Sequence, residues 1–309
     1  MGVFAGPVRS NAWRRRARAV AAGTALLLVS LLAAGVPDRT PLEQGRLWRV
    51  SRPGVPDSFV LGTIHVADPR VARIAPPVAA ALERSRTLAL EAVPLPMPPD
   101  ALDELELLAD GGRLEPLIGA ATYAEVRRAL AAQGHDDATV ARLKPWAAML
   151  KVARIGGPDD ERSLDENLFG AALDRRMRVE PMEAAADQAA AFDAIPPATQ
   201  VALLVHALAN RDELAATIEP AIAAWLRGDL PHLADLARRA GDRFPEVRQH
   251  YDVLARHVIV NRTAVFHHRL FLALRAGRVF VAVGASHLSG DAGLLALLRE
   301  DGYRVTPVW

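Results

Sequence analysis

The sequence predicts an α/β fold in which a mixed β-sheet core is built from both ends of the chain. Apolar β-type runs occur near both termini, and each lies in a strand–helix–strand order typical of βαβ units. The residues between them have almost wholly helical patterns. We therefore expect one domain over residues 37–309, with its core from residues 45–93 and 277–309 and a large helical lobe inserted at about residues 100–275.

The N-terminal part of the core is expected to begin as a β-hairpin. Its strands cover residues 47–51 and 58–62, and a Pro-Gly pair marks the turn between them. A helix over residues 78–86 and a third strand over residues 87–93 follow. This order predicts a βαβ unit whose last strand carries a carboxylate, Glu91, within an apolar run.

The middle of the chain is rich in alanine, which favours helices. A Ser-Leu-Asp-Glu sequence at residues 163–166 has the form of a capping box and predicts the start of a helix there. One short strand is expected at residues 178–183. The expected helices cover residues 100–110, 123–133, 137–155, 163–175, 197–209, 212–227, 230–240 and 245–276, and the helix at 137–155 is expected to bend at Pro145.

The C-terminal part of the core returns to the strand–helix–strand order. A strand is expected at residues 278–283, a helix at residues 292–300 and a last strand at residues 303–309.

Composition excludes several kinds of chemistry. The 309 residues include no cysteine, which excludes disulfides, thiol nucleophiles and cysteine-based metal sites. Any metal ion must therefore be held mainly by His, Asp or Glu. The formal net charge is +1, and no basic stripe with interleaved aromatic residues is present, so we expect no nucleic-acid partner.

The N-terminus has the features of an export signal. An arginine-rich segment at residues 13–18 precedes a charge-free apolar run at residues 19–34, which ends in small residues. Residues 1–36 are thus expected to be a cleaved signal peptide or an uncleaved N-terminal membrane anchor. In either case we expect the domain to be exported, as a periplasmic, extracellular or membrane-anchored protein.

Two distant segments share one pattern, an apolar run followed by Gly-x-x-His. They are residues 59–65, ending in His65, and residues 279–287, ending in His287. Chance alone gives roughly 0.6 Gly-x-x-His matches in a chain of this composition, so the bare pattern is weak evidence for a shared site. The strand-like run before each copy strengthens it. Imidazole is the commonest protein ligand for transition metals. The two histidines either share one site at the carboxyl ends of strands or are two unrelated strand-end residues.

The same segments resemble a known family. Residues 47–50 (Leu-Trp-Arg-Val) and 60–65 (Val-Leu-Gly-Thr-Ile-His) resemble the opening of the TraB/GumN family, and residues 281–290 (Val-Ala-Val-Gly-Ala-Ser-His-Leu-Ser-Gly) resemble its closing motif. The resemblance continues through residues 297–308 and covers nearly all of the chain after the signal. One departure is an Arg-Thr pair at residues 262–263, where the family usually has Arg-Asn.

The resemblance implies a fold similar to the erythromycin-esterase and ChaN-like proteins. It also implies kinship with the TIKI proteins, which are metal-dependent proteases with paired Gly-x-x-His motifs. By that similarity, His65 and His287 are expected to bind a metal ion, with Glu91 as a carboxylate ligand. The cofactor expected is a divalent ion, Mn, Co or Zn.

Catalytic roles are expected for two further residues. Glu183 is a candidate general base or extra ligand, and Arg262 is a candidate for stabilising an oxyanion. The function expected is an exported metal-dependent hydrolase, most simply a peptidase, acting on a peptide or small-molecule substrate. The alternatives are a non-catalytic ligand-binding or signalling protein, and a metal-independent esterase-like hydrolase with His65 as general base.

Overall fold

The computed structural model describes residues 41–309 except residue 67 and residues 94–103 and 155–161. The predicted signal peptide or anchor therefore lies outside the described residues, as do the first residues of the predicted helix at 100–110. Six strands form one sheet in the order β4-β3-β5-β2-β1-β6, which confirms the predicted α/β class. The strands are β1 (Leu47–Arg52), β2 (Val55–Thr63), β3 (Thr87–Leu90), β4 (Arg178–Pro181), β5 (Val279–Gly284) and β6 (Arg304–Pro307).

The sheet is mixed, and its parallel part comes from both ends and the middle of the chain. Strands β4, β3, β5 and β2 are parallel neighbours, whereas β1 pairs antiparallel with both β2 and β6. Gly284 of β5 lies opposite Thr63 of β2, and Leu90 of β3 lies opposite both Ala282 and Pro181. The carboxyl ends of the four parallel strands therefore meet at one edge of the sheet.

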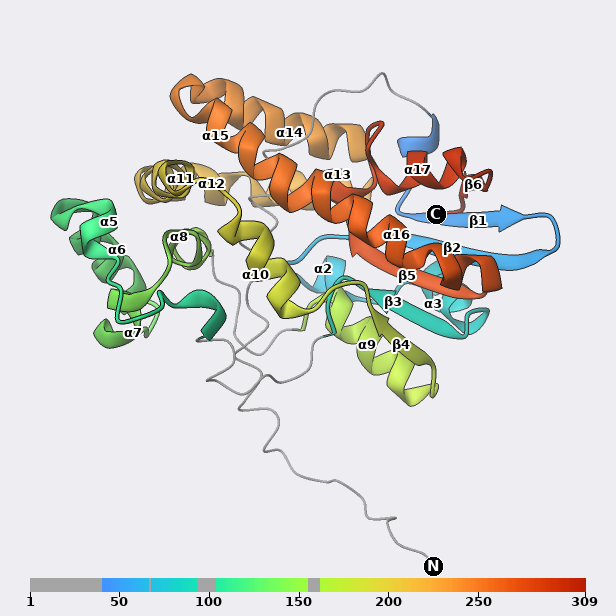
Figure 1. Ribbon diagram of the computed structural model, residues 1–309. Helices are drawn as coiled ribbons and strands as arrows, with labels where there is room; N and C mark the ends of the chain where they lie inside the picture. The colour runs from blue at the N-terminus through green and yellow to red at the C-terminus, as the bar shows by residue number, and fades with distance from the viewer. Residues whose placement is uncertain (1–40, 67, 94–103, 155–161) are drawn as a thin grey trace, which may run out of the picture.

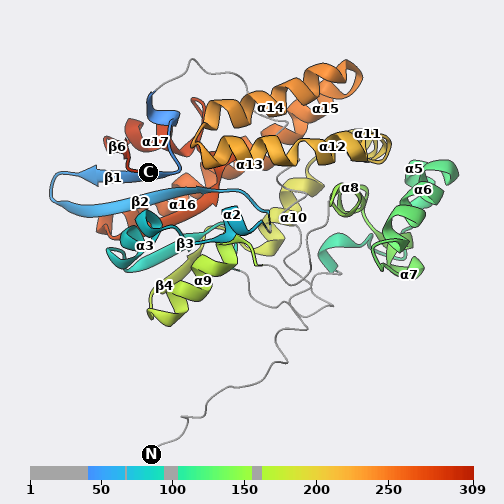
Figure 2. The ribbon, with the colours of Figure 1, turned by 180° about the vertical axis from the view of Figure 1, so that it is seen from behind.

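Helices cover both faces of the sheet. Helices α16 (Asn261–Ala276) and α17 (Leu294–Glu300) lie over one face (Figure 1). On the other face are α2 (Pro69–Ala72), α3 (Pro76–Glu83) and α9 (Leu164–Asp174) (Figure 2). A short 3₁₀ turn, η5 (Ala285–His287), follows β5. Parallel strands covered on both faces are expected to be apolar throughout, and every residue of β5 is buried.

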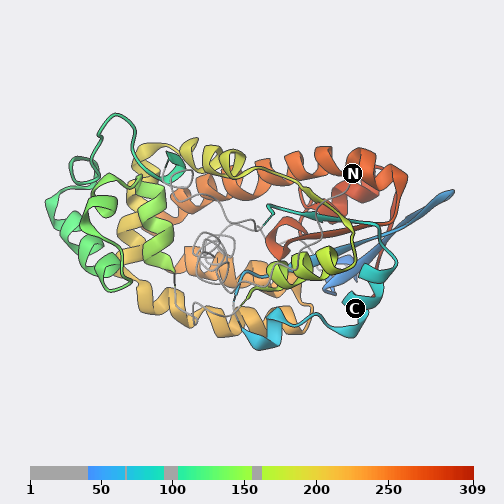
Figure 3. The same ribbon diagram turned by 90° about the horizontal axis from the view of Figure 1, so that it is seen from below.

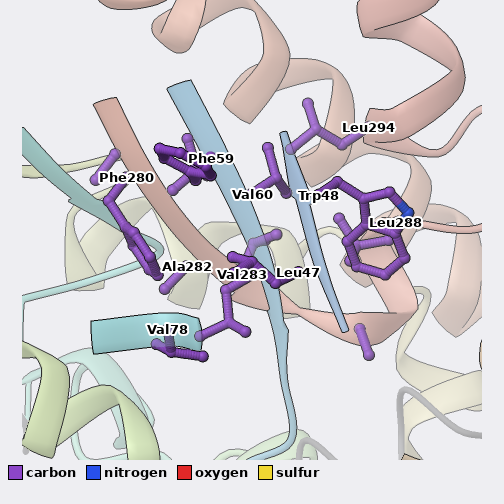
Figure 4. Close-up of a cluster of buried hydrophobic side chains, with 14 of the residues drawn as sticks. Leu47, Trp48, Phe59, Val60, Val78, Phe280, Ala282, Val283, Leu288 and Leu294 are labelled. Carbon is purple, nitrogen blue, oxygen red and sulfur yellow. The ribbon is translucent and has the colours of Figure 1, made fainter. Parts of the chain in front are cut away.

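The main core lies between the sheet and these helices. Figure 4 shows Trp48, Val60 and Phe280 of the strands with Val78 of α3 and Leu294 of α17. Gly62 of β2 is also needed here, because a Cβ atom at that position would come within 2.8 Å of Leu288 Cδ1. The first glycine of the repeated pattern thus permits close packing between β2 and the segment after β5.

A second core lies in the helical lobe, at the end of the molecule away from the β1–β2 hairpin (Figure 3). The helices that contribute to it are α5 (Glu115–Ile118), α6 (Ala120–Ala131), α7 (Asp137–Arg142), α8 (Pro145–Ala153), α10 (Ala185–Asp193), α11 (Pro197–Ala209), α12 (Arg211–Ala216) and α15 (Pro245–Ala255).

Residues from the middle of the chain contribute to both cores. Strand β4 joins the sheet, and α9, α13 (Ile218–Leu226), α14 (Leu230–Arg243) and α16 bury side chains in the main core. Helix α10 has no counterpart among the helices expected from the sequence.

Three helices expected from the sequence are interrupted, and the one expected at residues 212–227 is divided into α12 and α13. The helix expected at residues 137–155 is divided into α7 and α8, because Lys144 precedes a proline and is extended. The helix expected at residues 245–276 consists of α15, a π-helical turn η4 (Arg256–Val260) and α16. Such π turns often occur at functional sites, and this one ends two residues before Arg262.

Among the described residues, no single helix combines the length and apolar character needed to cross a membrane. Helices α10 and α11 meet that test only as a pair, and they are bent by 96° relative to each other.

One buried histidine of the helical lobe makes stability depend on pH. The ring of His206 is 4.5 Å from that of Phe244, and its Nδ1 lies 3.1 Å from Nδ2 of Asn210. Burial lowers the pKa of His206, so on acidification the unfolded chain takes up a proton before the folded chain does. We expect the free energy of unfolding to fall below about pH 6.5, by at most about 1.4 kcal/mol per pH unit from this residue.

Urea unfolding at pH 7.5 and pH 5.5 measures this effect. His206→Gln is expected to be less stable than wild type at pH 7.5 but to lose less stability on acidification. The control is His268→Gln on the exposed surface of α16, which should lose as much as wild type. Equal losses in wild type and His206→Gln would contradict the prediction.

Candidate functional site

The four parallel strands each deliver one polar side chain to the same edge of the sheet. His65 follows β2, Glu91 follows β3, Glu183 follows β4 and His287 follows β5. The backbone ladder continues beyond the strands, since the N–H of Glu183 donates to the carbonyl of Glu91 at 2.8 Å. These are the positions where α/β sheets place ligand sites.

Glu91 is the centre of this group. Its Oε1 accepts a hydrogen bond from the N–H of Gly284 at 2.6 Å, and its Oε2 accepts one from Nη2 of Arg262 at 2.8 Å. The Nε2 atoms of His65 and His287 lie 3.8 and 4.0 Å from the same Oε1. The two histidines of the repeated pattern therefore converge on one carboxylate oxygen.

Arg262 connects the two glutamates. Its Nε donates to Oε2 of Glu183 at 3.0 Å, and its Nη2 donates to both Glu183 Oε1 and Glu91 Oε2. Its Nη1 donates to the carbonyl of Val258, in the π turn, at 3.0 Å. The arginine is 4 % exposed, and both oxygens of Glu183 accept hydrogen bonds from it. The guanidinium thus holds the two carboxylates at fixed positions.

His65 is oriented by a residue that the sequence analysis did not assign to the site. Nδ1 of His65 lies 3.2 Å from Oδ2 of Asp165, whose Oδ1 accepts a hydrogen bond from Thr63 Oγ1 at 3.1 Å. Asp165 is in the first turn of α9, whose capping box at Ser163 the sequence did indicate. The capping box places the helix start, but nothing in it shows that α9 reaches the end of β2.

His287 is oriented by Thr263. Its Nδ1 lies 2.8 Å from Oγ1 of Thr263, and its ring packs against that of Phe266 at 5.1 Å. Thr263 takes the place of the asparagine expected from the family resemblance, and its hydroxyl supplies a polar contact to the imidazole.

Burial and charge set the protonation of the two histidines. Burial alone would lower the pKa of His65, but the carboxylates of Asp165 and Glu91 outweigh it and raise the pKa to about 10. For His287, burial is the largest effect, and with Arg262 nearby it lowers the pKa to about 3 despite Glu91. The two imidazoles therefore differ in charge at neutral pH.

The pKa values of the two glutamates are also shifted in opposite directions. Burial would raise the pKa of Glu91, but the neighbouring imidazoles and Arg262 hold it well below its ordinary value. Burial raises the pKa of Glu183, and the guanidinium of Arg262 offsets this only in part. Glu91 is thus the glutamate more firmly held as a carboxylate.

The donor set suits a divalent cation. His65 and His287 each have Nδ1 occupied and Nε2 facing Glu91. A Cβ atom at Gly284 would lie 3.0 Å from Glu91 Oε1 and 3.5 Å from His65 Nε2, so this glycine leaves space between the donors. The carboxylates of Glu91, Glu183 and Asp165 outnumber the two cations of the group, which are the guanidinium of Arg262 and the protonated imidazole of His65. A metal ion bound at Nε2 of His65 would displace its proton.

The donors are not drawn together as in a formed metal site. Within the part of the chain that the structure describes, no group of three or more His, Asp or Glu side chains has the arrangement of a metal site. The donors of a tetrahedral zinc site lie about 3.3 Å apart. The distances from Oε1 of Glu91 to Nε2 of His65 and to Nε2 of His287, 3.8 and 4.0 Å, would therefore have to shorten.

Comparison with known proteins identifies the family. A family model described as the TraB/PrgY/gumN family matches residues 46–307, which is nearly all of the described chain. No curated protein and no solved structure gives a significant match. The match includes every residue of the site, from His65 after β2 to His287 after β5, and so the chain belongs to the TraB/PrgY/gumN family.

Proposed function

We propose that this protein is an exported metal-dependent hydrolase that acts on peptides. The observation that supports the proposal is the convergence of His65 Nε2 and His287 Nε2 on Oε1 of Glu91. Two imidazoles and one carboxylate are a common ligand set of catalytic zinc sites in hydrolases. The peptide class and the export come from the family resemblance and the N-terminal sequence.

In this proposal His65, Glu91 and His287 hold the ion. When bound, a divalent ion supplies Lewis-acid polarisation of the scissile carbonyl and acidifies a water molecule. Asp165 orients His65 through Nδ1, as carboxylates do for metal-binding histidines in other proteins. The side chain of His65 is 19 % exposed, compared with 1 % for His287, so we expect substrate to approach from the side of His65.

The contacts favour positioning roles for Arg262 and Glu183. Arg262 holds Glu91, and Glu183 holds Arg262 through both of its oxygens. Glu183 would act as a proton acceptor only after its ion pair with Arg262 had opened. We therefore assign to this pair the task of keeping Glu91 in place and ionised.

Turnover of a peptide library by the full-length chain tests the function. We expect turnover to require Mn²⁺, Co²⁺ or Zn²⁺, to stop on chelation and to return when the metal is restored. His65→Ala and His287→Ala should each reduce it to background, whereas His268→Ala, on exposed α16, should leave it unchanged. Full activity in a folded His65→Ala or His287→Ala variant would refute the assignment.

One observation favours a second candidate function. The 3.2 Å contact between Asp165 and Nδ1 of His65 is also the arrangement by which a carboxylate orients a histidine general base. A metal-independent hydrolase would keep its activity in the presence of a chelator and would lose it in His65→Ala. Its activity would rise toward alkaline pH, because His65, with its pKa raised to about 10, acts as a base only after losing a proton. A non-catalytic binding protein would show no turnover under any of these conditions.

A further inference from the structure

The hydroxyl of Thr263 lies between two groups that determine where its proton points. Oγ1 is 2.7 Å from the carbonyl oxygen of Ile259 and 2.8 Å from Nδ1 of His287. A hydroxyl has one proton, and a carbonyl oxygen can only accept. Oγ1 therefore donates to Ile259 and accepts from the N–H at Nδ1 of His287. Thr263 and His287 are each 1 % exposed, so this arrangement is buried.

The π turn η4 provides the carbonyls for this arrangement. It interrupts the regular helical hydrogen bonding between α15 and α16. The carbonyl of Ile259 accepts from the side chain of Thr263, and that of Val258 accepts from the side chain of Arg262. Neighbouring residues of one helix are thus directed to different parts of the site, Arg262 to Glu91 and Thr263 to His287.

We propose that Thr263 is a positioning residue that holds His287 in the tautomer protonated at Nδ1. The Nε2 lone pair of His287 then faces Glu91 Oε1, 4.0 Å away. The other tautomer carries its proton on Nε2 and cannot bind a metal ion through that atom. The effect on metal binding rests on the proposed function, whereas the tautomer itself does not.

The tautomer is measured by ¹⁵N NMR of histidine-labelled, metal-free, full-length protein, with His287→Gln used to assign the signals. Wild type and Thr263→Ser should show His287 protonated at Nδ1, because both keep the hydroxyl. Thr263→Val has the same shape without the hydroxyl and should show His287 protonated wholly or partly at Nε2. The control is Thr199→Val, which removes a similar contact to Nδ1 of His250 in the helical lobe and should leave His287 unchanged.

Binding of Zn²⁺ alone gives a second measurement. We expect Thr263→Val to bind Zn²⁺ about 10–100-fold more weakly than wild type, the usual cost of losing a group that orients a ligand. Thr263→Ser and Thr199→Val should bind it as wild type does. A wild-type His287 protonated at Nε2, or an unchanged tautomer in Thr263→Val, would overturn the proposal. A changed tautomer in Thr263→Val, with no Zn²⁺ binding by wild type, would support the role of Thr263 and refute the metal-dependent function.

Discussion

Replacement of Arg262 by methionine is expected to lower the free energy of unfolding by about 3–5 kcal/mol, the usual cost of removing one partner of a buried ion pair. Methionine keeps much of the aliphatic volume of arginine. The carboxylates of Glu91 and Glu183, however, are left buried without the guanidinium that they share. Chemical denaturation at pH 7 measures this loss directly.

A second arginine on the same helix provides the control. Arg269 pairs with Asp187, but its side chain is 41 % exposed, so Arg269→Met should cost at most about 1 kcal/mol. In the double variant Arg262→Met, Glu183→Gln, one of the two uncompensated charges is gone, and part of the lost stability should return. Equal losses in Arg262→Met and Arg269→Met would contradict the description of Arg262 as the buried counter-charge.

The second large effect is expected at Glu91. Glu91→Gln keeps the shape of the side chain but removes the charge on which His65 and His287 converge. We expect it to weaken Zn²⁺ binding by more than about 100-fold, beyond the range for groups that only orient a ligand. The variant should remain folded, because Arg262 keeps its ion pair with Glu183. Titration with Zn²⁺ measures the affinity, and circular dichroism of the same variant measures whether it is folded.

Glu180 supplies the matched control for Glu91. It lies in β4 of the same sheet and forms an ion pair with Arg178 away from the histidines. Glu180→Gln should bind Zn²⁺ as wild type does. If Glu91→Gln bound Zn²⁺ as tightly as Glu180→Gln, Glu91 would not be a ligand.

The residues at the strand ends could be predicted from the sequence because their signals are local. An apolar run, a glycine and a histidine mark the ends of β2 and β5 without any knowledge of their neighbours. Glu91 was recognisable because a carboxylate is unusual in an apolar strand. That these strands are adjacent could not be predicted, because their pairing depends on residues more than two hundred positions apart.

The residues that orient the two histidines could not be predicted from the sequence. Asp165 and Thr263 lie on helices, and their roles depend on how α9 and α16 pack over the ends of β2 and β5. Arg262 was identified, but its bidentate pairing with Glu183 depends on the packing of α16 beside the end of β4, which helical periodicity does not reveal. Helical periodicity identifies the buried face of a helix but not the element against which that face packs.

Elemental analysis of the purified full-length protein, with wild type beside His65→Ala and His287→Ala, is the most direct test of a metal site shared by the two histidines. We expect close to one equivalent of Mn, Co or Zn per chain in wild type and none in either variant. Wild type without metal after reconstitution, or either folded variant with the wild-type amount, would contradict the shared site.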